Sequence, residues 1–277
     1  MAGLDRGHKF DFTRQHFVKV RGLLYDHAGI VLADHKQDMA YNRLARRLRE
    51  LRLDSFDAYL EALDASPMEF GQFINAMTTN LTAFFREKHH FDFVRSTILP
   101  EIEASGQKRL RGWSAGCSLG EETYSLAIAI KEAGVNTDSW DIRLLATDIN
   151  SKVLHGAQSG VYELDRVKTL SDEQMKNWFL KGVGKNQGCV KVRQELQQMI
   201  TFRYLNLMDE WPFKGPFDFI FCRNVMIYFD KDTQMNLLER MAAMLKPGGY
   251  LFVGHSETLA RKTTRFRLVG HTIYKKA

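Results

Sequence analysis

The chain has 277 residues, of which 44% are apolar and 26% are charged, a balance typical of a globular protein with one large domain or two smaller ones. It holds no apolar run near the roughly 20 residues of a membrane-spanning helix, and its first residues, MAGLDRGHKFDF, lack the apolar core of a signal peptide, so we expect a cytoplasmic protein. Three widely spaced cysteines argue against a disulfide framework and against a bound metal, whereas the net charge of +6 leaves nucleic acid, a membrane surface or an acidic protein open as the partner.

Helical spacing of apolar residues dominates the first part of the chain. It predicts helices over residues 10–29, 34–53, 55–65 and 66–77, and a further helix over 87–106 that is bent or interrupted at Pro100. Ser55 and Ser66 are the expected N-caps, with Glu69 completing a capping box. We therefore predict an N-terminal helical domain over residues 1–90.

The second of these helices has an unusual charge pattern. Its stretch RLARRLRELRL holds five arginines and one acid, Glu50. Leu44, Leu48 and Leu51 form one apolar stripe, with the arginines spread over the rest of the surface. Such a surface either binds an acidic partner or is simply solvated, and both interpretations stay open on spacing alone.

From Arg109 onward the pattern changes to strands that alternate with helices. Strands are predicted over residues 109–116, 141–150, 198–207, 216–224, 250–256 and 266–276, the last of which could be two strands, and helices over 117–134, 151–160 and 230–249. This alternation indicates a doubly wound, mostly parallel α/β sheet over residues 91–277. Residues 161–198 break the alternation, and the turn GVGKNQG within them predicts an inserted subdomain with a small β-hairpin.

An open parallel sheet binds ligands at the carboxyl ends of its strands. The first strand leads into SAGCSLGEE, a glycine loop that lacks the lysine of a phosphate loop and instead carries Glu121 and Glu122. Two carboxylates repel a pyrophosphate and favour a ligand with an amino or sulfonium group. Asp148 ends the second strand, where it either accepts hydrogen bonds from ribose hydroxyls or, together with Asn150 and Ser151, caps the next helix. Together these features indicate S-adenosylmethionine as the cofactor.

The ordered motifs TTNLTAFFRE, SAGCSLGEETYSLAI, ATDIN, FDFIFCRNVMIYFD and LKPGGYLFVGHSE resemble those of the CheR family, the chemotaxis receptor glutamate methyltransferases. The resemblance covers nearly the whole chain. It implies an S-adenosylmethionine-dependent methyltransferase fold, and transfer of a methyl group to glutamate γ-carboxylates on the cytoplasmic helices of chemoreceptors, which leaves S-adenosylhomocysteine.

The resemblance also implies the roles of particular residues. The cofactor contacts carried over from the family are Asn80, Thr82, Arg86, Glu121, Asp148, Asn206, Leu207, Arg223 and Asn224. Arg86 is the candidate for positioning cofactor or substrate, and Tyr228 for orienting the acceptor carboxylate, although Tyr228 could equally be a packing residue beside Ile227 and Phe229. We expect Phe84 and Phe85 to pack where the two domains meet.

The family also supplies a partner for the arginine-rich helix. Chemoreceptor helices are acidic, so Arg43, Arg46, Arg47 and Arg49 are candidates for docking them. The inserted hairpin could hold a receptor's C-terminal tail by strand addition. We expect a monomer that meets the membrane only through the receptor.

Two other functions remain open at this point. The basic helix is compatible with a nucleic-acid methyltransferase, although the fourth strand ends in RNVMIYF rather than in the Asn/Asp-Pro-Pro-Tyr/Phe motif of such enzymes. The chain could also be a signalling module that senses the cofactor without catalysing a reaction.

Overall fold

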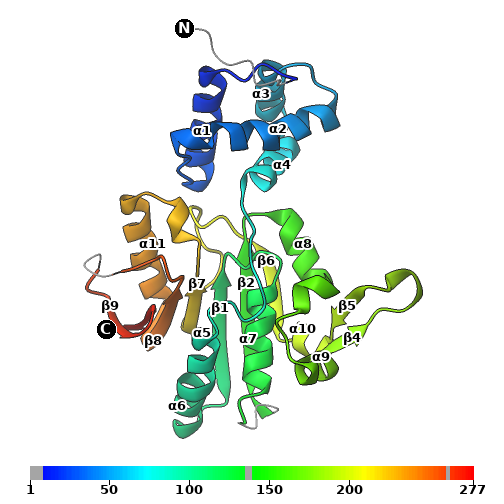
Figure 1. The fold of residues 1–277 in the computed structure, drawn as a ribbon. Helices are drawn as coiled ribbons and strands as arrows, with labels where there is room; N and C mark the ends of the chain where they lie inside the picture. Colours follow the sequence, from blue (N-terminus) through cyan, green and yellow to red (C-terminus); the bar gives the residue numbers. More distant parts are fainter. Residues whose placement is uncertain (1–8, 135–138, 260–262) are drawn as a thin grey trace. The chain divides into compact units, whose positions relative to one another are not determined.

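The computed structural model describes residues 9–134, 139–259 and 263–277 (Figure 1). The chain divides into two compact units, one ending at Thr79 and the other beginning at Asn80. This division precedes the boundary expected at residue 90, because the intervening segment packs within the second unit. The Phe84 ring contacts those of Tyr162 and Phe179, with centroids 5.1 and 5.7 Å away. Phe84 therefore belongs to the core of the second unit, and the partly buried Phe85 packs against that core. That the two rings also pack where the domains meet stays a prediction.

The first unit is helical, as predicted. Its elements are α1 (Arg14–Ala28), a 3₁₀ turn (Asp34–Lys36), α2 (Gln37–Leu51), α3 (Phe56–Ala65) and α4 (Pro67–Met77). Ser55 and Ser66 cap α3 and α4 by accepting hydrogen bonds from the Ala58 and Glu69 amides. In the apolar stripe of α2, Leu44 and Leu48 are buried, but Leu51, on the last turn of the helix, is exposed.

The Glu69 carboxylate joins two helices rather than completing a capping box. It accepts hydrogen bonds from Nε and Nη2 of Arg47 on α2, at 3.0 and 2.6 Å, and from the Tyr59 hydroxyl on α3 at 3.2 Å. On the same face of α2, Nη1 of Arg43 donates to the carbonyls of Met77 and Thr78 at the end of α4. Two of the arginines expected to dock a receptor thus stabilise the helical unit itself.

The second unit begins with a helix that changes its winding. It consists of α5 (His89–Phe93), a π-helical segment (Val94–Ile98) and α6 (Leu99–Ala104). Pro100, where a bend was expected, has no amide hydrogen to donate to the preceding turn. The disturbance is taken up by the π-helical segment directly before α6, and the helix continues.

A seven-stranded sheet with the order β6-β2-β1-β7-β8-β10-β9 forms the centre of this unit. Its strands are β1 (Arg109–Ala115), β2 (Asp141–Asp148), β6 (Ile200–Tyr204), β7 (Phe217–Cys222), β8 (Leu245–Val253), β9 (Phe266–Gly270) and β10 (Ile273–Lys276). The first five are parallel, and β10 pairs antiparallel with both β8 and β9. The chain leaves β1 in one direction towards β2 and returns on the other side at β7, which places the switch point between β1 and β7.

Both faces of the sheet are covered, as β7 illustrates. Phe219 and Phe221 belong to a core shared with α5 and α7 (Glu121–Lys131), whereas Ile220 and Cys222 belong to a core shared with α11 (Lys231–Met244). Every residue of β7 is buried, as expected for a central strand of a doubly wound fold. The predicted fold class is therefore confirmed.

Two details differ from or add to the sequence expectations. The helix predicted over residues 230–249 was expected to end with the sequence Pro-Gly-Gly at 247–249. Instead, α11 ends at Met244, and the Pro-Gly-Gly turn lies inside β8, where the β7–β8 register shifts. The inserted region forms a separate antiparallel sheet, β3-β5-β4, from β3 (Val161–Glu163), β4 (Phe179–Lys181) and β5 (Cys189–Val192). Its β4–β5 hairpin confirms the inserted β subdomain.

The remaining elements of this unit are short. They are α8 (Ser151–Ser159), 3₁₀ turns over Leu164–Val167, Gly184–Asn186 and Met226–Tyr228, α9 (Asp172–Trp178) and α10 (Gln194–Gln197). Within the described ranges, the helices are all too short or too polar to cross a membrane.

The Arg47–Glu69 pair predicts a measurable contribution to the stability of the helical unit. We expect Glu69→Ala to lower the hydrogen-exchange protection of α4 amides by about 100-fold, since breaking a largely buried ion pair costs roughly 3 kcal/mol. The matched control is Glu50→Ala, which removes a more exposed partner of the same arginine and should change protection less than about threefold. Equal effects of the two variants would contradict this role of Glu69.

Candidate functional site

The loop that follows β1 is fastened to the end of β2. The amides of Gly116 and Cys117 both donate to the Thr147 carbonyl, at 2.8 and 2.9 Å. Gly116 has a φ of 90°, and a Cβ at this position would lie 2.4 Å from the Val225 side chain, beyond the end of β7. Glycine is therefore required here for packing against the neighbouring loop, not only for the approach of a ligand.

Asp148 holds the same loop from the end of β2. Its Oδ2 accepts a hydrogen bond from the Ser118 amide and its Oδ1 one from the Asn150 amide, both at 2.8 Å. Asn150, not Asp148, caps α8 by accepting from the amides of Lys152 and Val153. Of the three residues in the capping alternative, Asn150 is therefore the cap, and Asp148 is not. Burial raises the pKa of Asp148, against the opposing effect of these hydrogen bonds.

The segment that begins at Asn80 lies on this loop. The Ser118 hydroxyl donates to the Asn80 carbonyl at 3.0 Å, and the Phe85 amide donates to the Ser125 hydroxyl of α7 at 2.9 Å. The structure thus brings the segment carrying Asn80, Thr82 and Arg86 to the carboxyl end of β1. The Arg86 guanidinium donates to the Leu81 carbonyl at 3.2 Å within its own segment.

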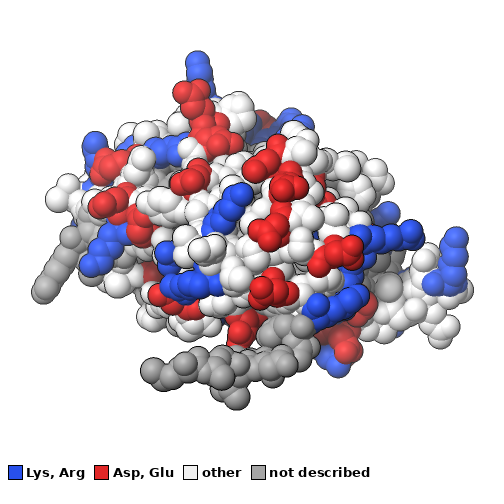
Figure 2. Space-filling model, turned by 90° about the horizontal axis from the view of Figure 1, so that it is seen from above, with Lys and Arg blue, Asp and Glu red and all other residues white. Residues whose placement is uncertain are grey.

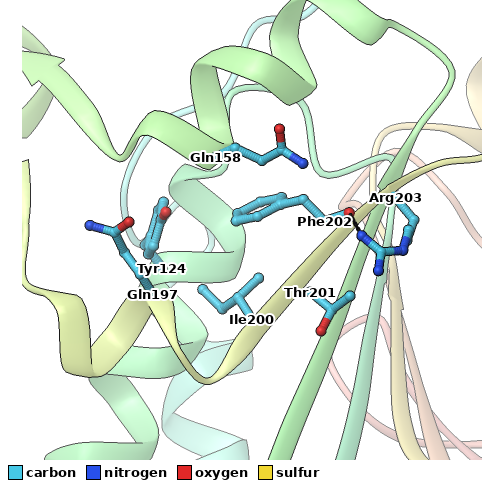
Figure 3. A pocket seen from close by; sticks show the side chains of 7 residues that line it. All are labelled: Tyr124, Gln158, Gln197, Ile200, Thr201, Phe202 and Arg203. Atoms are coloured by element: carbon cyan, nitrogen blue, oxygen red, sulfur yellow. Dashed lines mark hydrogen bonds between the residues drawn. The ribbon is translucent and has the colours of Figure 1, made fainter.

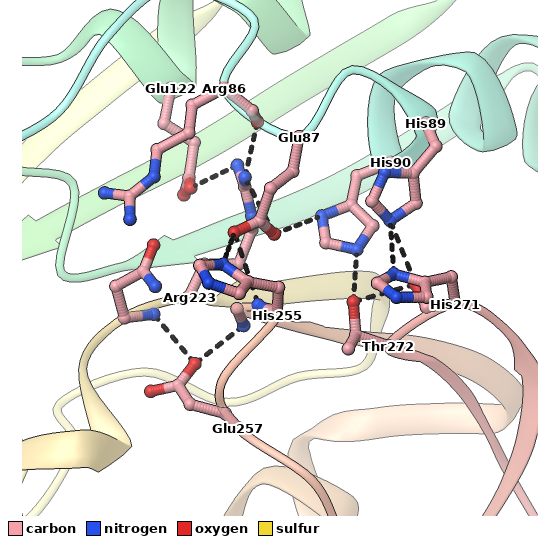
Figure 4. Close-up of polar contacts among 12 residues, drawn as sticks. Arg86, Glu87, His89, His90, Glu122, Arg223, His255, Glu257, His271 and Thr272 are labelled. Carbon is pink, nitrogen blue, oxygen red and sulfur yellow. Dashed lines mark hydrogen bonds and ion pairs between the residues drawn. The ribbon is translucent and has the colours of Figure 1, made fainter.

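A buried ion-pair cluster around Arg223 closes the site on the β7 side (Figure 4). The Arg223 side chain is only 2% exposed and lies between two carboxylates, with Nη1 2.9 Å from Glu122 Oε2 and Nη2 3.2 Å from Glu87 Oε2. The guanidinium also donates to the Arg86 carbonyl and lies near the rings of Phe91 and Phe221. Arg223 therefore links the segment of Arg86 to α7 and to the sheet.

Glu87 and Glu122 differ in their electrostatic surroundings. Burial opposes the ionisation of Glu87, but Arg223 and the hydrogen bonds from the ring and amide of His255 outweigh it and lower its pKa to about 2. Burial dominates at Glu122 and raises its pKa, although Arg223 and the Ser114 hydroxyl stabilise the carboxylate. Sequence reasoning missed Glu87 because a glutamate beside an arginine in a polar stretch has no distinctive pattern.

A second carboxylate that sequence reasoning missed, Glu257, organises the loop after β7. It accepts hydrogen bonds from the amides of Asn224, Ile227 and Gly254, at 2.8, 3.2 and 2.6 Å. Asn224 adopts a left-handed φ of 58°, and a Cβ on Gly254 would lie 2.4 Å from its side chain. The half-buried Tyr228 follows in the 3₁₀ turn Met226–Tyr228. The motif GHSE, which ends at Glu257, was the only feature of the sequence that pointed to this residue.

The remaining expected residues follow β1 and β6. Glu121 is fully buried at the start of α7 and pairs with Arg166. Asn206 folds the loop after β6, since its Oδ1 accepts from the Met208 amide and its Nδ2 donates to Asp209. The Leu207 carbonyl accepts from Trp211 and Arg240. All nine expected cofactor positions thus lie in the second unit, at strand ends or on the segment packed against them, and their contacts with a cofactor stay a prediction.

A cavity of about 370 Å³ lies elsewhere, beside the edge strand β6 (Figure 3). Its lining residues come from β6 and the ends of neighbouring helices: Tyr124, Gln158, Gln197, Ile200, Thr201, Phe202 and Arg203. None of the expected cofactor residues is among them. We therefore assign the site to the strand ends and not to this cavity.

Comparisons with known proteins identify the family to which the chain is similar. The family model for the CheR methyltransferase SAM-binding domain matches residues 80–275, and that for the CheR methyltransferase all-alpha domain matches residues 15–78. A chemotaxis protein methyltransferase of Salmonella typhimurium is 49% identical over 94% of this chain and 89% of its own length. Chemotaxis protein methyltransferase 2 of Pseudomonas aeruginosa is 46% identical over 97% and 95%, and the Escherichia coli protein is 46% identical over 94% and 90%.

The depressed pKa of Glu87 predicts a pH dependence of stability. A carboxylate whose pKa is lower in the folded than in the unfolded chain stabilises the fold above the unfolded pKa, and loses this effect as pH falls through the folded value. We expect Glu87→Gln to be less stable than the wild type by about 2–3 kcal/mol near pH 7, with the gap narrowing below about pH 5.

Urea denaturation at a series of pH values measures this gap. Glu103→Gln, at an exposed position on α6, is the control and should follow the wild type at every pH. A gap for Glu87→Gln that stays constant down to about pH 3 would show that the carboxylate does not act through its charge.

Proposed function

This chain belongs to the CheR methyltransferase family and uses S-adenosylmethionine in chemotaxis, and we propose that it methylates the γ-carboxylates of specific glutamates on the cytoplasmic helices of chemoreceptors. The product is a glutamate methyl ester together with S-adenosylhomocysteine. The reaction belongs in the cytoplasm, where these helices lie, and we expect the enzyme to act as a monomer.

The observation that carries this proposal is the hydrogen bond between Ser118 and the Asn80 carbonyl. It brings an arginine-bearing segment to a glycine loop flanked by carboxylates. The residues present fit a cationic cofactor, since Glu121 and Asp148 are buried acids at this edge and Oε2 of Glu121 has no hydrogen-bond partner. We propose that Asp148 binds the ribose of the cofactor and that Glu121 binds its amino group.

The chain's own residues have a limited chemical task. Bound S-adenosylmethionine supplies an electrophilic methyl group on its sulfonium. A glutamate carboxylate is already ionised at neutral pH, because its ordinary pKa is about 4.3, so the reaction needs no general base. The enzyme must align the carboxylate and exclude water. Arg86 is the proposed group for holding the acceptor carboxylate, and Tyr228 for orienting it.

Receptor docking remains a proposal for the exposed arginines of α2. Arg46 is 72% exposed and Arg49 also faces solvent, whereas Arg43 and Arg47 are engaged within the helical unit. Figure 2 shows Lys and Arg side chains interspersed with Asp and Glu side chains on the face that it draws. Among the described residues of that face, the positive charge forms no continuous patch of the kind that binds nucleic acid.

The decisive assay uses labelled S-adenosylmethionine and chemoreceptor-containing membranes. We expect base-labile methyl esters on receptor glutamates. Label on added DNA or RNA instead would favour a nucleic-acid methyltransferase. Cofactor binding without transfer to any receptor would leave a non-catalytic sensing module.

Arg86 provides a direct test of the mechanism. We expect Arg86→Ala to lower kcat/KM by about 100-fold, because a bidentate, charge-assisted contact with a carboxylate is lost. Arg86→Lys should recover only part of the activity, since lysine keeps the charge but cannot make the bidentate contact. Thermal unfolding should be unchanged. Lys88→Ala, which removes an exposed cation two residues away, is the control. Wild-type turnover in Arg86→Ala would remove Arg86 from the mechanism.

Docking by α2 predicts a different kinetic signature. We expect Arg46→Glu combined with Arg49→Glu to raise KM for receptor membranes by about tenfold while kcat is kept, since these residues meet the substrate away from the reacting atoms. Arg14→Glu combined with Lys19→Glu, at two exposed positions on α1, is the charge-matched control on the same unit. An unchanged KM at low salt would exclude these two arginines from docking.

A further inference from the structure

Glu121 is an unusual carboxylate for a position at the start of a helix. Such acids are normally solvated, but Glu121 is 0% exposed. Its Oε1 accepts hydrogen bonds from Nε of Arg166, at 2.8 Å, and from Nη2 of the same residue. Its Oε2 is buried without a hydrogen-bond partner. One oxygen is thus fixed by a guanidinium, and the other is an acceptor whose burial is uncompensated.

Arg166 comes from the inserted subdomain and not from the sheet. It lies in the 3₁₀ turn Leu164–Val167, directly after β3, and its side chain is 35% exposed. The hydroxyl of Tyr162, on β3, donates to the Leu119 carbonyl of the glycine loop at 2.7 Å. The first strand and turn of the inserted subdomain therefore contact the loop and the helix start on which the cofactor is proposed to bind.

We propose that Arg166 is a positioning residue of the cofactor site, which holds Glu121 by one oxygen so that the other meets the α-ammonium group of the cofactor. This inference rests on the proposed role of Glu121. A buried, unpartnered carboxylate oxygen accepts a hydrogen bond from a charged donor at little further desolvation cost. Because both contacts of Arg166 go to Oε1, the guanidinium orients the carboxylate without occupying the acceptor. The inserted subdomain thereby becomes a component of the cofactor site.

Calorimetric titration of the full chain with S-adenosylhomocysteine tests this role. We expect Arg166→Met to weaken binding by about tenfold or more, and Arg166→Lys to restore part of the affinity, since it keeps the charge but not the two donors. Lys168→Met, which removes an exposed cation two residues further along, is the control and should bind like the wild type. Tighter binding by Arg166→Met would mean that Arg166 competes with the cofactor, and would overturn the proposal.

A second ligand separates positioning from a general structural role. The analogue of S-adenosylhomocysteine that lacks the α-amino group cannot use Oε2 of Glu121. Wild-type protein should therefore bind it far more weakly than the parent ligand, and this discrimination should shrink in Arg166→Met. Equal weakening for both ligands would show that Arg166 acts only on the fold. Combining Arg166→Met with Glu121→Gln should weaken binding no further than Glu121→Gln alone, because both changes remove the same contact.

These measurements are independent of the methyl acceptor. If receptor membranes are not methylated but Arg166→Met no longer distinguishes S-adenosylhomocysteine from the analogue, the inference about Arg166 is supported and the proposed substrate is wrong. If the wild-type chain discriminates and Arg166→Met discriminates equally well, the inference falls and the proposed substrate is unaffected.

Discussion

The site depends on the ion pairs that the buried guanidinium of Arg223 makes with Glu87 and Glu122. Removing an arginine from water costs several kcal/mol unless charged and polar partners compensate for it. Here the partners come from four places: Glu87 and the Arg86 carbonyl from the segment after Thr79, Glu122 from α7, and one aromatic ring each from α5 and β7. The ion pairs can form only when this segment and α7 have both packed against the sheet. Folding of the second unit therefore fixes the position of the Arg86 backbone before any ligand is bound.

The glycine loop is held from the opposite side in a comparable way. Asp148 and Thr147 fix it to β2, Tyr162 fixes it to the inserted subdomain, and Ser118 fixes it to Asn80. Most of these contacts use backbone groups of the loop, so side chains remain to meet a ligand. Preorganisation of this kind lowers the entropy cost of binding, because the loop does not have to be ordered by the cofactor.

Much of this architecture could be predicted from the sequence, because it depends on local patterns. The alternation of apolar strands and helices predicted the sheet, and the serine caps predicted the starts of α3 and α4. The pairing of Arg223 with Glu87 and Glu122, and of Arg166 with Glu121, could not be predicted, since these partners are joined only by the tertiary fold. The PGG motif was misassigned for a related reason. Proline and glycine end helices but also create irregularities in strands, and only the pairing of β8 with β7 distinguishes the two.

The distribution of charge at the strand ends matters for the proposed reaction, in which a cationic donor must meet an anionic acceptor. Carboxylates dominate where the cofactor is proposed to bind, with Glu121 and Asp148 both buried. Arg223 lies close by, but Glu87 and Glu122 neutralise it, so it should not repel a sulfonium. The guanidinium of Arg86 donates to a neutral carbonyl and carries no such carboxylate partner among the described contacts. This supports the proposal that Arg86 attracts the acceptor carboxylate, because fixed charges of this kind stabilise a reaction without reorganising during it.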